Sequence, residues 1–198
     1  MKELVVATKN KGKAEEFRVM FSGYGIEVKS LLDFPEAVQD IVEDGTTFEE
    51  NAIIKAEAIA AEYDIPVAAD DSGLEVDALD GRPGIFSARY AGEEKNDQKN
   101  LEKVLTELKG VPAGERTARF VCAVAVARPG HKTFVKRGTC EGTIAESPRG
   151  TEGFGYDPIF IPTGSDRTMA EHSSEEKNSI SHRKNAILEI EQWLQQLS

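Results

Sequence analysis

The sequence is poor in cysteine and histidine, the side chains that most often hold transition metals. Its 198 residues include two cysteines and three histidines. Cys122 and Cys140 each fall in a strand-like segment and form no Cys-x-x-Cys pair, so we predict two small buried thiols. His131, His172 and His182 are too far apart for the short ligand spacing of a zinc site. A transition-metal centre is therefore not expected.

Positively charged residues are also few, since the sequence has 24 lysines and arginines but 35 aspartates and glutamates, which gives a formal net charge of -11. Nucleic-acid polymers and anionic membranes select basic surfaces, so we expect neither as a partner. The sequence shows no charged-then-apolar leader, no long apolar run and no lipidation motif, and we expect a cytoplasmic protein. Its hydrophobic content of 39% is sufficient for one substantial core, with room for two lobes.

Helical and strand-like patterns alternate along the chain. A strand-like run at 4–7 precedes a helical pattern with Phe17, Met20 and Phe21 on one face. A capping box at 47–50 predicts the start of a second helix, which Pro66 ends. Further patterns predict a helix over 97–108, paired strands over 120–127 and 132–140, and a last helix with the stripe Ala186, Ile187, Ile190 and Leu194. This order favours a mixed sheet flanked by helices.

Two adjacent carboxylates, Asp70 and Asp71, follow the apolar run at 65–69 and precede Ser72-Gly73. We predict that a buried strand ends at this pair. Carboxylates in such a place are costly unless a cation receives them, and a divalent metal is the obvious candidate. Neighbouring side chains on an extended segment point to opposite sides, which predicts one catalytic and one supporting carboxylate. An Asp-rich turn closed by Gly73 is the alternative.

A loop with the chemistry of a phosphate site follows the first strand, at Thr8-Lys9-Asn10-Lys11-Gly12-Lys13. It leads into a helix, whose N-terminal amides and positive dipole end attract anions. Its three lysines add positive charge. The spacing is not that of a Walker A loop, and a solvated lysine face is the alternative.

Two late segments add polar and aromatic groups. The segment 150–158 combines three glycines, which permit close backbone approach, with Phe154 and Tyr156, which could stack on a base. A glycine-rich turn with both aromatic side chains in the core is the alternative. The segment 173–183 places Lys177 and the pair His182-Arg183 near the starts of helical stretches, where they could bind an anion or a carbonyl oxygen.

Six ordered motifs, spread over essentially the whole chain, resemble those of the inosine triphosphate pyrophosphatase family and specifically its bacterial XTP/dITP diphosphatases. They lie at residues 8–13, 47–56, 69–74, 83–90, 154–158 and 176–183. The resemblance implies an α/β fold, elongated and two-lobed, around a long curved mixed sheet with flanking helices. It also implies a single domain over 1–198 with a central nucleotide cleft, dependence on Mg²⁺, and a homodimer.

The same resemblance implies an activity and a set of roles. The activity is hydrolysis of ITP, dITP and XTP to the monophosphate and pyrophosphate, which removes non-standard purines from the nucleotide pool. Asp71 would activate the attacking water and bind Mg²⁺ with Glu43, supported by Asp70. The substrate-binding residues would be Thr8, Lys9, Asn10, Lys11, Gly12, Lys13, Lys55 and Ser72 for the phosphate side, and Phe154, Gly155, Tyr156, Asp157, Lys177, His182 and Arg183 for the nucleoside side.

Other functions fit the same residues less well. A non-catalytic nucleotide sensor would not need Glu43, Asp70, Asp71 and the lysines together. A structural or interaction protein would not need both an anion loop and a base-stacking loop. Among enzymes, a pyrophosphatase for other modified nucleotides is the alternative. A pocket in which Arg183 or His182 donates to the 6-oxygen of the base would exclude adenine, so ATP is expected to be a poor substrate.

Overall fold

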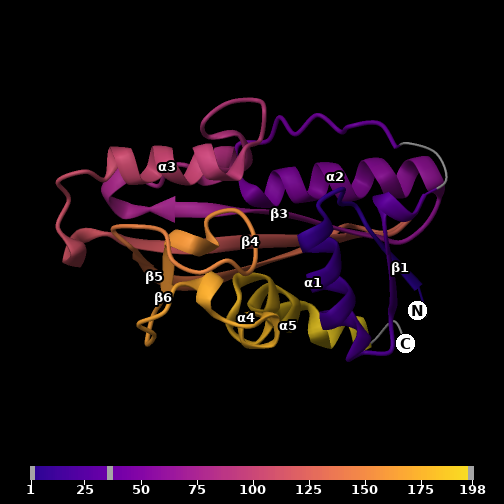
Figure 1. Ribbon diagram of the computed structural model, residues 1–198. Coiled ribbons are helices and arrows are strands. Elements are labelled where there is room, and N and C mark those ends of the chain that lie inside the picture. The colour runs from indigo at the N-terminus through magenta and orange to yellow at the C-terminus, as the bar shows by residue number, and fades with distance from the viewer. Residues whose placement is uncertain (1–2, 35–37, 196–198) are drawn as a thin grey trace. The chain divides into compact units, whose positions relative to one another are not determined.

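The computed structural model describes residues 3–34 and 38–195, and side chains only as far as Ile190. The stripe position Leu194 therefore lies outside the described side chains. Figure 1 shows the order of the elements along the chain. The strands are β1 (Glu3–Val6), β2 (Glu27–Ser30), β3 (Val67–Val76), β4 (Thr117–Ala127), β5 (Phe134–Ile144) and β6 (Phe160–Pro162). The α-helices are α1 (Lys11–Ser22), α2 (Phe48–Tyr63), α3 (Asp97–Glu107), α4 (Ser174–Ile180) and α5 (His182–Gln195).

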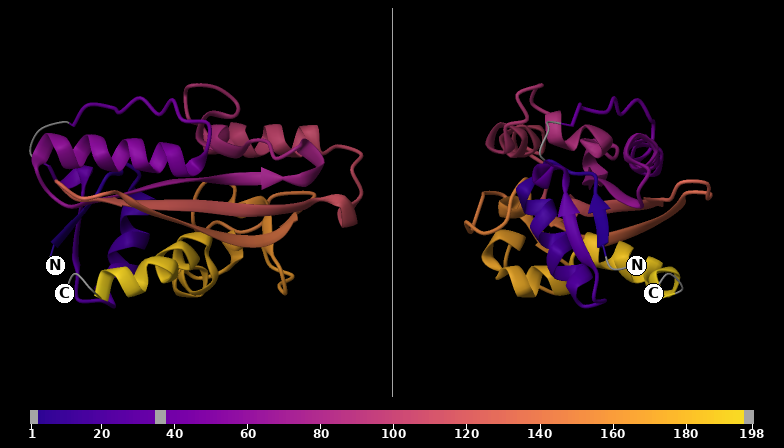
Figure 2. Two further views of the ribbon diagram at one scale, coloured as in Figure 1. Left: turned by 180° about the vertical axis from the view of Figure 1, so that it is seen from behind. Right: turned by 90° about the vertical axis from the view of Figure 1, so that its right-hand side faces the viewer.

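The strands form one sheet in the order β2-β1-β3-β4-β5-β6. Strand β1 is parallel to both of its neighbours, pairing Leu4 with Val28 of β2 and Val6 with Ala68 of β3. Strands β5 and β6 are antiparallel, and β4 and β5 run side by side as two long ribbons (Figure 2). The predicted α/β fold with a mixed sheet and flanking helices is therefore confirmed.

The chain divides into two compact units. Unit 1 consists of Met1–Asp71, Cys122–Gly138 and Arg183–Ser198. Unit 2 consists of Ser72–Val121 and Thr139–His182. Strands β3, β4 and β5 each contribute residues to both units. The single domain with a central nucleotide cleft stays a prediction.

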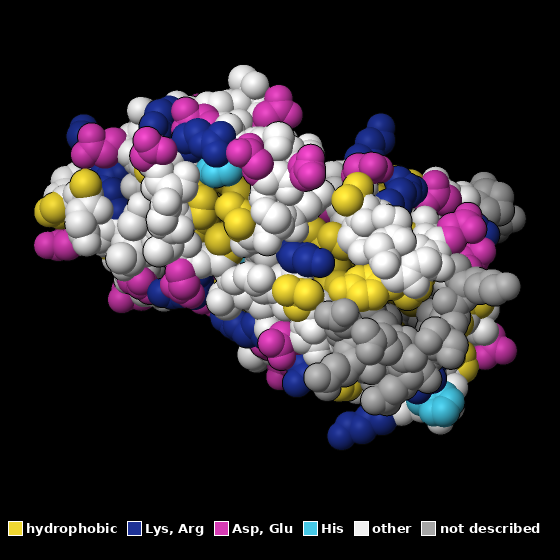
Figure 3. Space-filling model, turned by 90° about the horizontal axis from the view of Figure 1, so that it is seen from below, with side chains coloured by type: hydrophobic (Ala, Val, Ile, Leu, Met, Phe, Trp, Pro, Cys, Tyr) yellow, Lys and Arg dark blue, Asp and Glu magenta, His cyan; other side chains and the backbone are white. Residues whose placement is uncertain are grey.

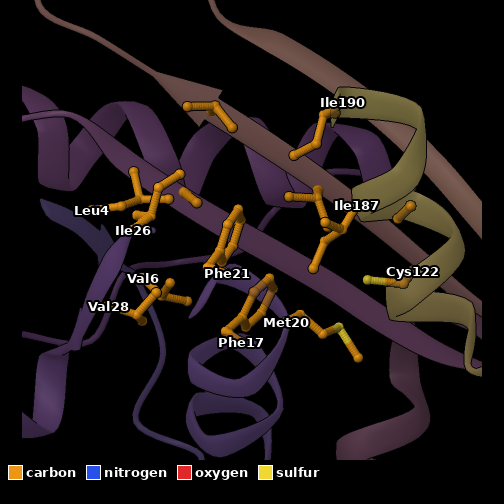
Figure 4. Packing of buried hydrophobic residues seen from close by; sticks show 14 residues of the cluster. Leu4, Val6, Phe17, Met20, Phe21, Ile26, Val28, Cys122, Ile187 and Ile190 are labelled. Atoms are coloured by element: carbon orange, nitrogen blue, oxygen red, sulfur yellow. The ribbon is translucent and has the colours of Figure 1, made fainter. Parts of the chain in front are cut away.

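The core of unit 1 depends on the apolar face of α1. Phe17, Met20 and Phe21 are buried at the i, i+3, i+4 spacing that the sequence predicts. The rings of Phe17 and Phe21 stack with their centroids 5.8 Å apart. Figure 4 shows these side chains against those of β1, β2 and α5, which include Leu4, Val6, Val28, Ile187 and Ile190, and against Ile26 just before β2. This packing holds the start of α1 and the end of β1 in place, and the predicted phosphate loop joins them.

The core of unit 2 is built on α3 and the neighbouring strands. Leu101 and Val104 of α3 and Leu108 just after it are buried at helical spacing. Phe120 of β4 and Phe160 of β6 contact each other with ring centroids 4.3 Å apart. The predicted helix over 97–108 is confirmed to within one residue.

One expectation about the strands was wrong, and two short strands were missed. Strand β3 continues from Val67 to Val76, so Asp70 and Asp71 lie within a strand and not at its end. The apolar residues Leu74 and Val76 are buried beyond the pair, and charges inside a strand are tolerated because cations from other elements meet them. The short strands β2 and β6 were not predicted, because four and three residues give too little periodicity to detect.

The surface carries charge of both signs. On the face seen in Figure 3, acidic and basic side chains alternate around smaller hydrophobic areas. Among the helices of the described chain, none is long and apolar enough to cross a lipid bilayer.

Candidate functional site

The two carboxylates of β3 are both buried but have different partners. Asp70 is 1% exposed, and its Oδ2 accepts from Lys13 Nζ at 2.9 Å and from Arg183 Nη2 at 3.0 Å. Asp71 is 8% exposed, and its Oδ2 accepts from Asn51 Nδ2 at 3.1 Å. The separate sets of contacts agree with the predicted alternation of side chains along an extended segment.

These surroundings move the two pKa values in opposite directions. Burial acts to raise the pKa of Asp70, but the positive charges of Lys13, Arg183 and Lys55 outweigh it and hold the pKa well below its usual range. For Asp71, burial dominates over Lys55 and Lys13 and raises the pKa. Asp70 is therefore a stable anion that holds cations, and Asp71 is the better proton acceptor of the pair.

A third carboxylate, Glu43, lies close to Asp71 in unit 1. Lys55 of α2 binds it, with 2.8 Å between Nζ and Oε2. Burial acts to lower the pKa of Lys55, but Glu43, Asp70 and Asp71 outweigh it and raise the pKa, so the side chain stays protonated. Glu43 in turn contributes to the raised pKa of Asp71 through like-charge repulsion.

The carboxylate oxygens of Glu43 and Asp71 suit a hard divalent cation such as Mg²⁺ or Mn²⁺, and not a softer metal that selects thiolate or imidazole ligands. In the described part of the chain, no three His, Cys, Asp or Glu side chains gather as metal ligands. Mg²⁺ needs fewer, because it is commonly bound by one or two carboxylates together with phosphate oxygens and water. Glu43 and Asp71 therefore stay the predicted ligands of a hard divalent cation that substrate phosphates complete.

The loop between β1 and α1 has the local structure of an anion site. Asn10 is the N-cap of α1, and its Oδ1 accepts from the Lys13 amide at 3.0 Å. Thr8 Oγ1 accepts from the Asn10 amide at 3.1 Å, which closes the turn before the helix. Lys11 and Gly12 form the first turn of α1, where backbone amides and the helix dipole favour negative charge.

Two of the three lysines of this loop form ion pairs. Lys13 Nζ is bound to Asp70, as described above. Lys9 Nζ donates to the carbonyl oxygen of Val38 at 2.5 Å and lies 2.6 Å from Asp40 Oδ1. Lys9 therefore ties the loop to the segment that leads to Glu43, a contact that the sequence alone did not indicate.

Arg183 completes the charged cluster of unit 1. Its guanidinium donates to Glu16 of α1 as well as to Asp70, and it lies over the ring of Phe17 with 5.4 Å between Cζ and the ring centroid. Glu16 and Asp70 outweigh the effect of burial and raise the pKa of Arg183 further above its usual value. Sequence reasoning missed Glu16, although its position three residues after Lys13 places both on one face of α1. In this structure Arg183 is a counter-ion, and its contact with a base stays a prediction.

A second group of predicted residues gathers in unit 2. Lys177 Nζ of α4 donates to Asp157 Oδ2 at 2.6 Å, and both side chains are buried. The Phe154 amide donates to the same oxygen at 3.0 Å, and Lys177 Nζ lies 4.3 Å from the centroid of the Phe154 ring. Gly153 has φ +75°, and a Cβ there would lie 2.1 Å from Asp157 Oδ2, so glycine is required for this turn.

The two aromatic residues of this segment have different surroundings. Tyr156 belongs to the core of unit 2, and its hydroxyl donates to the Ser87 carbonyl at 2.6 Å. Tyr156 is 5% exposed, so its ring packs in the core as the alternative interpretation of the glycine-rich segment describes, and a contact of Tyr156 with substrate stays a prediction. Phe154 is only partly buried and remains the aromatic candidate for a base. Gly155 donates its amide to Asp97 Oδ2 at 2.9 Å, which links the segment to the start of α3.

His182 and Arg183 are neighbours in sequence but belong to different units. The imidazole of His182 stacks on Phe120 with a centroid distance of 4.9 Å. Ser72 also belongs to unit 2, directly after Asp71 at the end of unit 1. Unit 1 therefore brings together the phosphate loop, Lys55, Glu43, Asp70, Asp71 and Arg183, and unit 2 brings together Phe154, Gly155, Asp157, Lys177 and His182.

Comparisons with known proteins agree with these motifs. Residues 4–193 match the model of a family described as the Ham1 family. A dITP/XTP pyrophosphatase of Halalkalibacterium halodurans is 62% identical over 194 residues, which cover 98% of this chain and 100% of the relative. The solved structure of the Staphylococcus aureus Ham1 protein is 46% identical with a TM-score of 0.84, and covers all of both chains. A HAM1 protein from Coxiella burnetii is 40% identical with a TM-score of 0.87, over 99% of this chain and 100% of that one.

Proposed function

Because this chain belongs to the Ham1 family, we propose that it is a nucleoside triphosphate pyrophosphatase for non-standard purine nucleotides. It hydrolyses ITP, dITP and XTP to the nucleoside monophosphate and pyrophosphate. Relatives named dITP/XTP pyrophosphatase at 55–62% identity support the substrate class. The observation that carries the chemistry is the buried pair Asp70 and Asp71, in which Asp70 accepts from Lys13 and Arg183 while Asp71 accepts from Asn51.

In the proposed reaction, a water molecule attacks the α-phosphorus and the bond from that phosphorus to the α–β bridging oxygen breaks. Asp71 accepts the proton of the water, and Asn51 holds its carboxylate in place. Lys13 and Lys55 offset the negative charge that develops on the departing pyrophosphate. Glu43 and Asp71 would hold Mg²⁺, which when bound would neutralise phosphate charge and lower the pKa of a bound water.

The residues of unit 2 are proposed to bind the base of the same nucleotide. Hypoxanthine and xanthine present a 6-oxygen and a protonated N1, whereas adenine presents an amino group and a bare nitrogen. A donor such as His182 matches the 6-oxygen and leaves the adenine amino group facing a donor. A buried polar mismatch costs about 1 to 3 kcal/mol, so ATP is expected to be a poor substrate. No residue is assigned to the 2′-hydroxyl, so ribose and deoxyribose forms are expected to react alike.

Two further parts of the proposal depend on the family resemblance, a homodimer and Mg²⁺ as the metal, while a cytoplasmic location stays the expectation drawn from the sequence. The predicted single domain of residues 1–198, in which both units act on one substrate molecule, belongs with them. The acidic net charge of -11 supports a small-molecule substrate over a nucleic-acid polymer or a membrane.

A nucleotide panel tests the function directly. The purified protein is incubated with Mg²⁺ and ITP, dITP, XTP, GTP, ATP or a modified pyrimidine triphosphate, and orthophosphate is measured with and without inorganic pyrophosphatase. We expect a signal for ITP, dITP and XTP well above GTP and ATP, and only when the pyrophosphatase is present. Orthophosphate without it would mean cleavage at the γ-phosphate. Binding without turnover would indicate a sensor, and turnover of the pyrimidine alone would indicate a different substrate class.

A further inference from the structure

Asn51, near the start of α2, contacts Asp71 and the backbone two residues after Glu43, the two carboxylates proposed to bind the metal. It is 3% exposed. Its Oδ1 accepts from the backbone amide of Gly45 at 2.9 Å, and its Nδ2 donates to Asp71 Oδ2 at 3.1 Å. A backbone amide can only donate, and an ionised carboxylate can only accept, so the two contacts together determine which way the Asn51 amide points.

The contact with Gly45 fixes the segment that carries Glu43, two residues earlier. A Cβ at position 45 would lie 2.7 Å from Asn51 Oδ1 and 2.8 Å from Glu50 Cβ, so the segment packs against α2 at a distance that only glycine allows. Thr46 adds to this attachment, since its amide and hydroxyl donate to Glu50 Oε2 at 2.6 and 2.9 Å. The first turn of α2 therefore holds the chain directly after Glu43.

Lys55 lies four residues after Asn51, which places both side chains on one face of α2. Lys55 binds the Glu43 carboxylate itself, while Asn51 holds the backbone of that segment and the Asp71 carboxylate. We propose that Asn51 is a positioning residue, which sets the separation of Glu43 and Asp71 so that both can bind one divalent cation. The inference rests on the proposed function, because it assigns Glu43 and Asp71 to the metal.

The test compares metal binding by Asn51→Ala and by a matched control, Asn100→Ala. Asn100 is also a buried helical asparagine with two contacts, accepting from the Ala91 amide at 2.7 Å and donating to the Ala88 carbonyl at 3.0 Å. Its partners are backbone groups only. Removing a residue that orients metal ligands weakens metal affinity by about 10- to 100-fold. We expect a loss in that range for Asn51→Ala and no change for Asn100→Ala.

Two readouts separate positioning from stability. Mn²⁺ binding without nucleotide is measured by electron paramagnetic resonance, and thermal unfolding is measured in EDTA. Both alanine variants are expected to unfold at lower temperature, but only Asn51→Ala should bind Mn²⁺ more weakly. Equal Mn²⁺ affinity of Asn51→Ala and the wild type would overturn the inference, as would a wild type that binds no Mn²⁺. Because this readout needs no substrate, an inactive wild type would count against the proposed function only.

A second variant covers the case in which Asn51→Ala does not fold. Gly45→Ala leaves Asn51 and Asp71 intact but forces the segment of Glu43 away from α2. We expect weaker Mn²⁺ binding here too. Its control is Gly114→Ala, where a Cβ would meet no atom within 4 Å. Unchanged Mn²⁺ affinity in Gly45→Ala would overturn the inference.

Discussion

Replacing Arg183 with methionine should destabilise the protein in a way that depends on pH. Arg183 is 1% exposed and donates to two carboxylates, Asp70 and Glu16. Removing one partner of a buried ion pair costs about 3 to 5 kcal/mol, because a charge stays buried with less compensation. Lys13 also binds Asp70, with 2.9 Å between Nζ and Oδ2, so Asp70 keeps one cation when Arg183 is removed and we expect the lower end of that range.

The pH dependence follows from the carboxylate pKa values. The pKa of Asp70 is depressed in the folded state, so its stabilising effect is present above the unfolded pKa of about 3.9 and is lost as pH falls toward the folded value. Without Arg183 that depression is smaller. The difference in unfolding free energy between wild type and Arg183→Met should therefore be largest near pH 7 and shrink below about pH 4.

Arg116 offers a matched control for this experiment. It is also buried, but its guanidinium donates to three backbone carbonyls, those of Leu108, Val111 and Ala145. Carbonyl groups do not titrate, so the cost of Arg116→Met should be the same at pH 7 and at pH 3.5 or so. Urea unfolding followed by far-ultraviolet circular dichroism in EDTA gives both free energies. A pH-independent cost for Arg183→Met, or one below about 1 kcal/mol, would refute the assignment of Arg183 as the buried counter-ion.

Two further predictions concern the metal and the thiols. Activity should disappear in EDTA and return with Mg²⁺. The variant Asp71→Asn should lose most of the turnover rate but unfold at a temperature close to that of the wild type. Loss of the fold in Asp71→Asn would instead favour a structural role for this carboxylate. Burial raises the pKa of Cys122 to about 12 and that of Cys140 to about 11. Neither thiol of the native protein should therefore react quickly with a disulfide reagent at pH 8, whereas two thiols per chain should react in denaturant. Rapid labelling of the native protein would contradict the burial of both side chains.

Much of the local structure could be predicted from the sequence, because local patterns determine it. The spacing of Phe17, Met20 and Phe21 is that of a helix with one buried face, and all three lie in the core of unit 1. The capping box at 47–50 correctly places the start of α2, with Thr47 as the N-cap. Asp70 and Asp71 could also be identified from the sequence as candidate site residues, because burying adjacent carboxylates in an apolar strand costs free energy unless a cation compensates their charge.

The different characters of Asp70 and Asp71 come only from the tertiary structure. Lys13 and Arg183 reach Asp70 from α1 and α5, and Arg183 is 113 residues away in the chain. Asn51 reaches Asp71 from α2. No local pattern encodes which of two neighbouring carboxylates will meet which cation, since that depends on how distant segments pack. The sequence by itself therefore determined the kinds of groups in the candidate site, and the packing of α1, α2 and α5 on β3 decided which carboxylate holds cations and which can accept a proton.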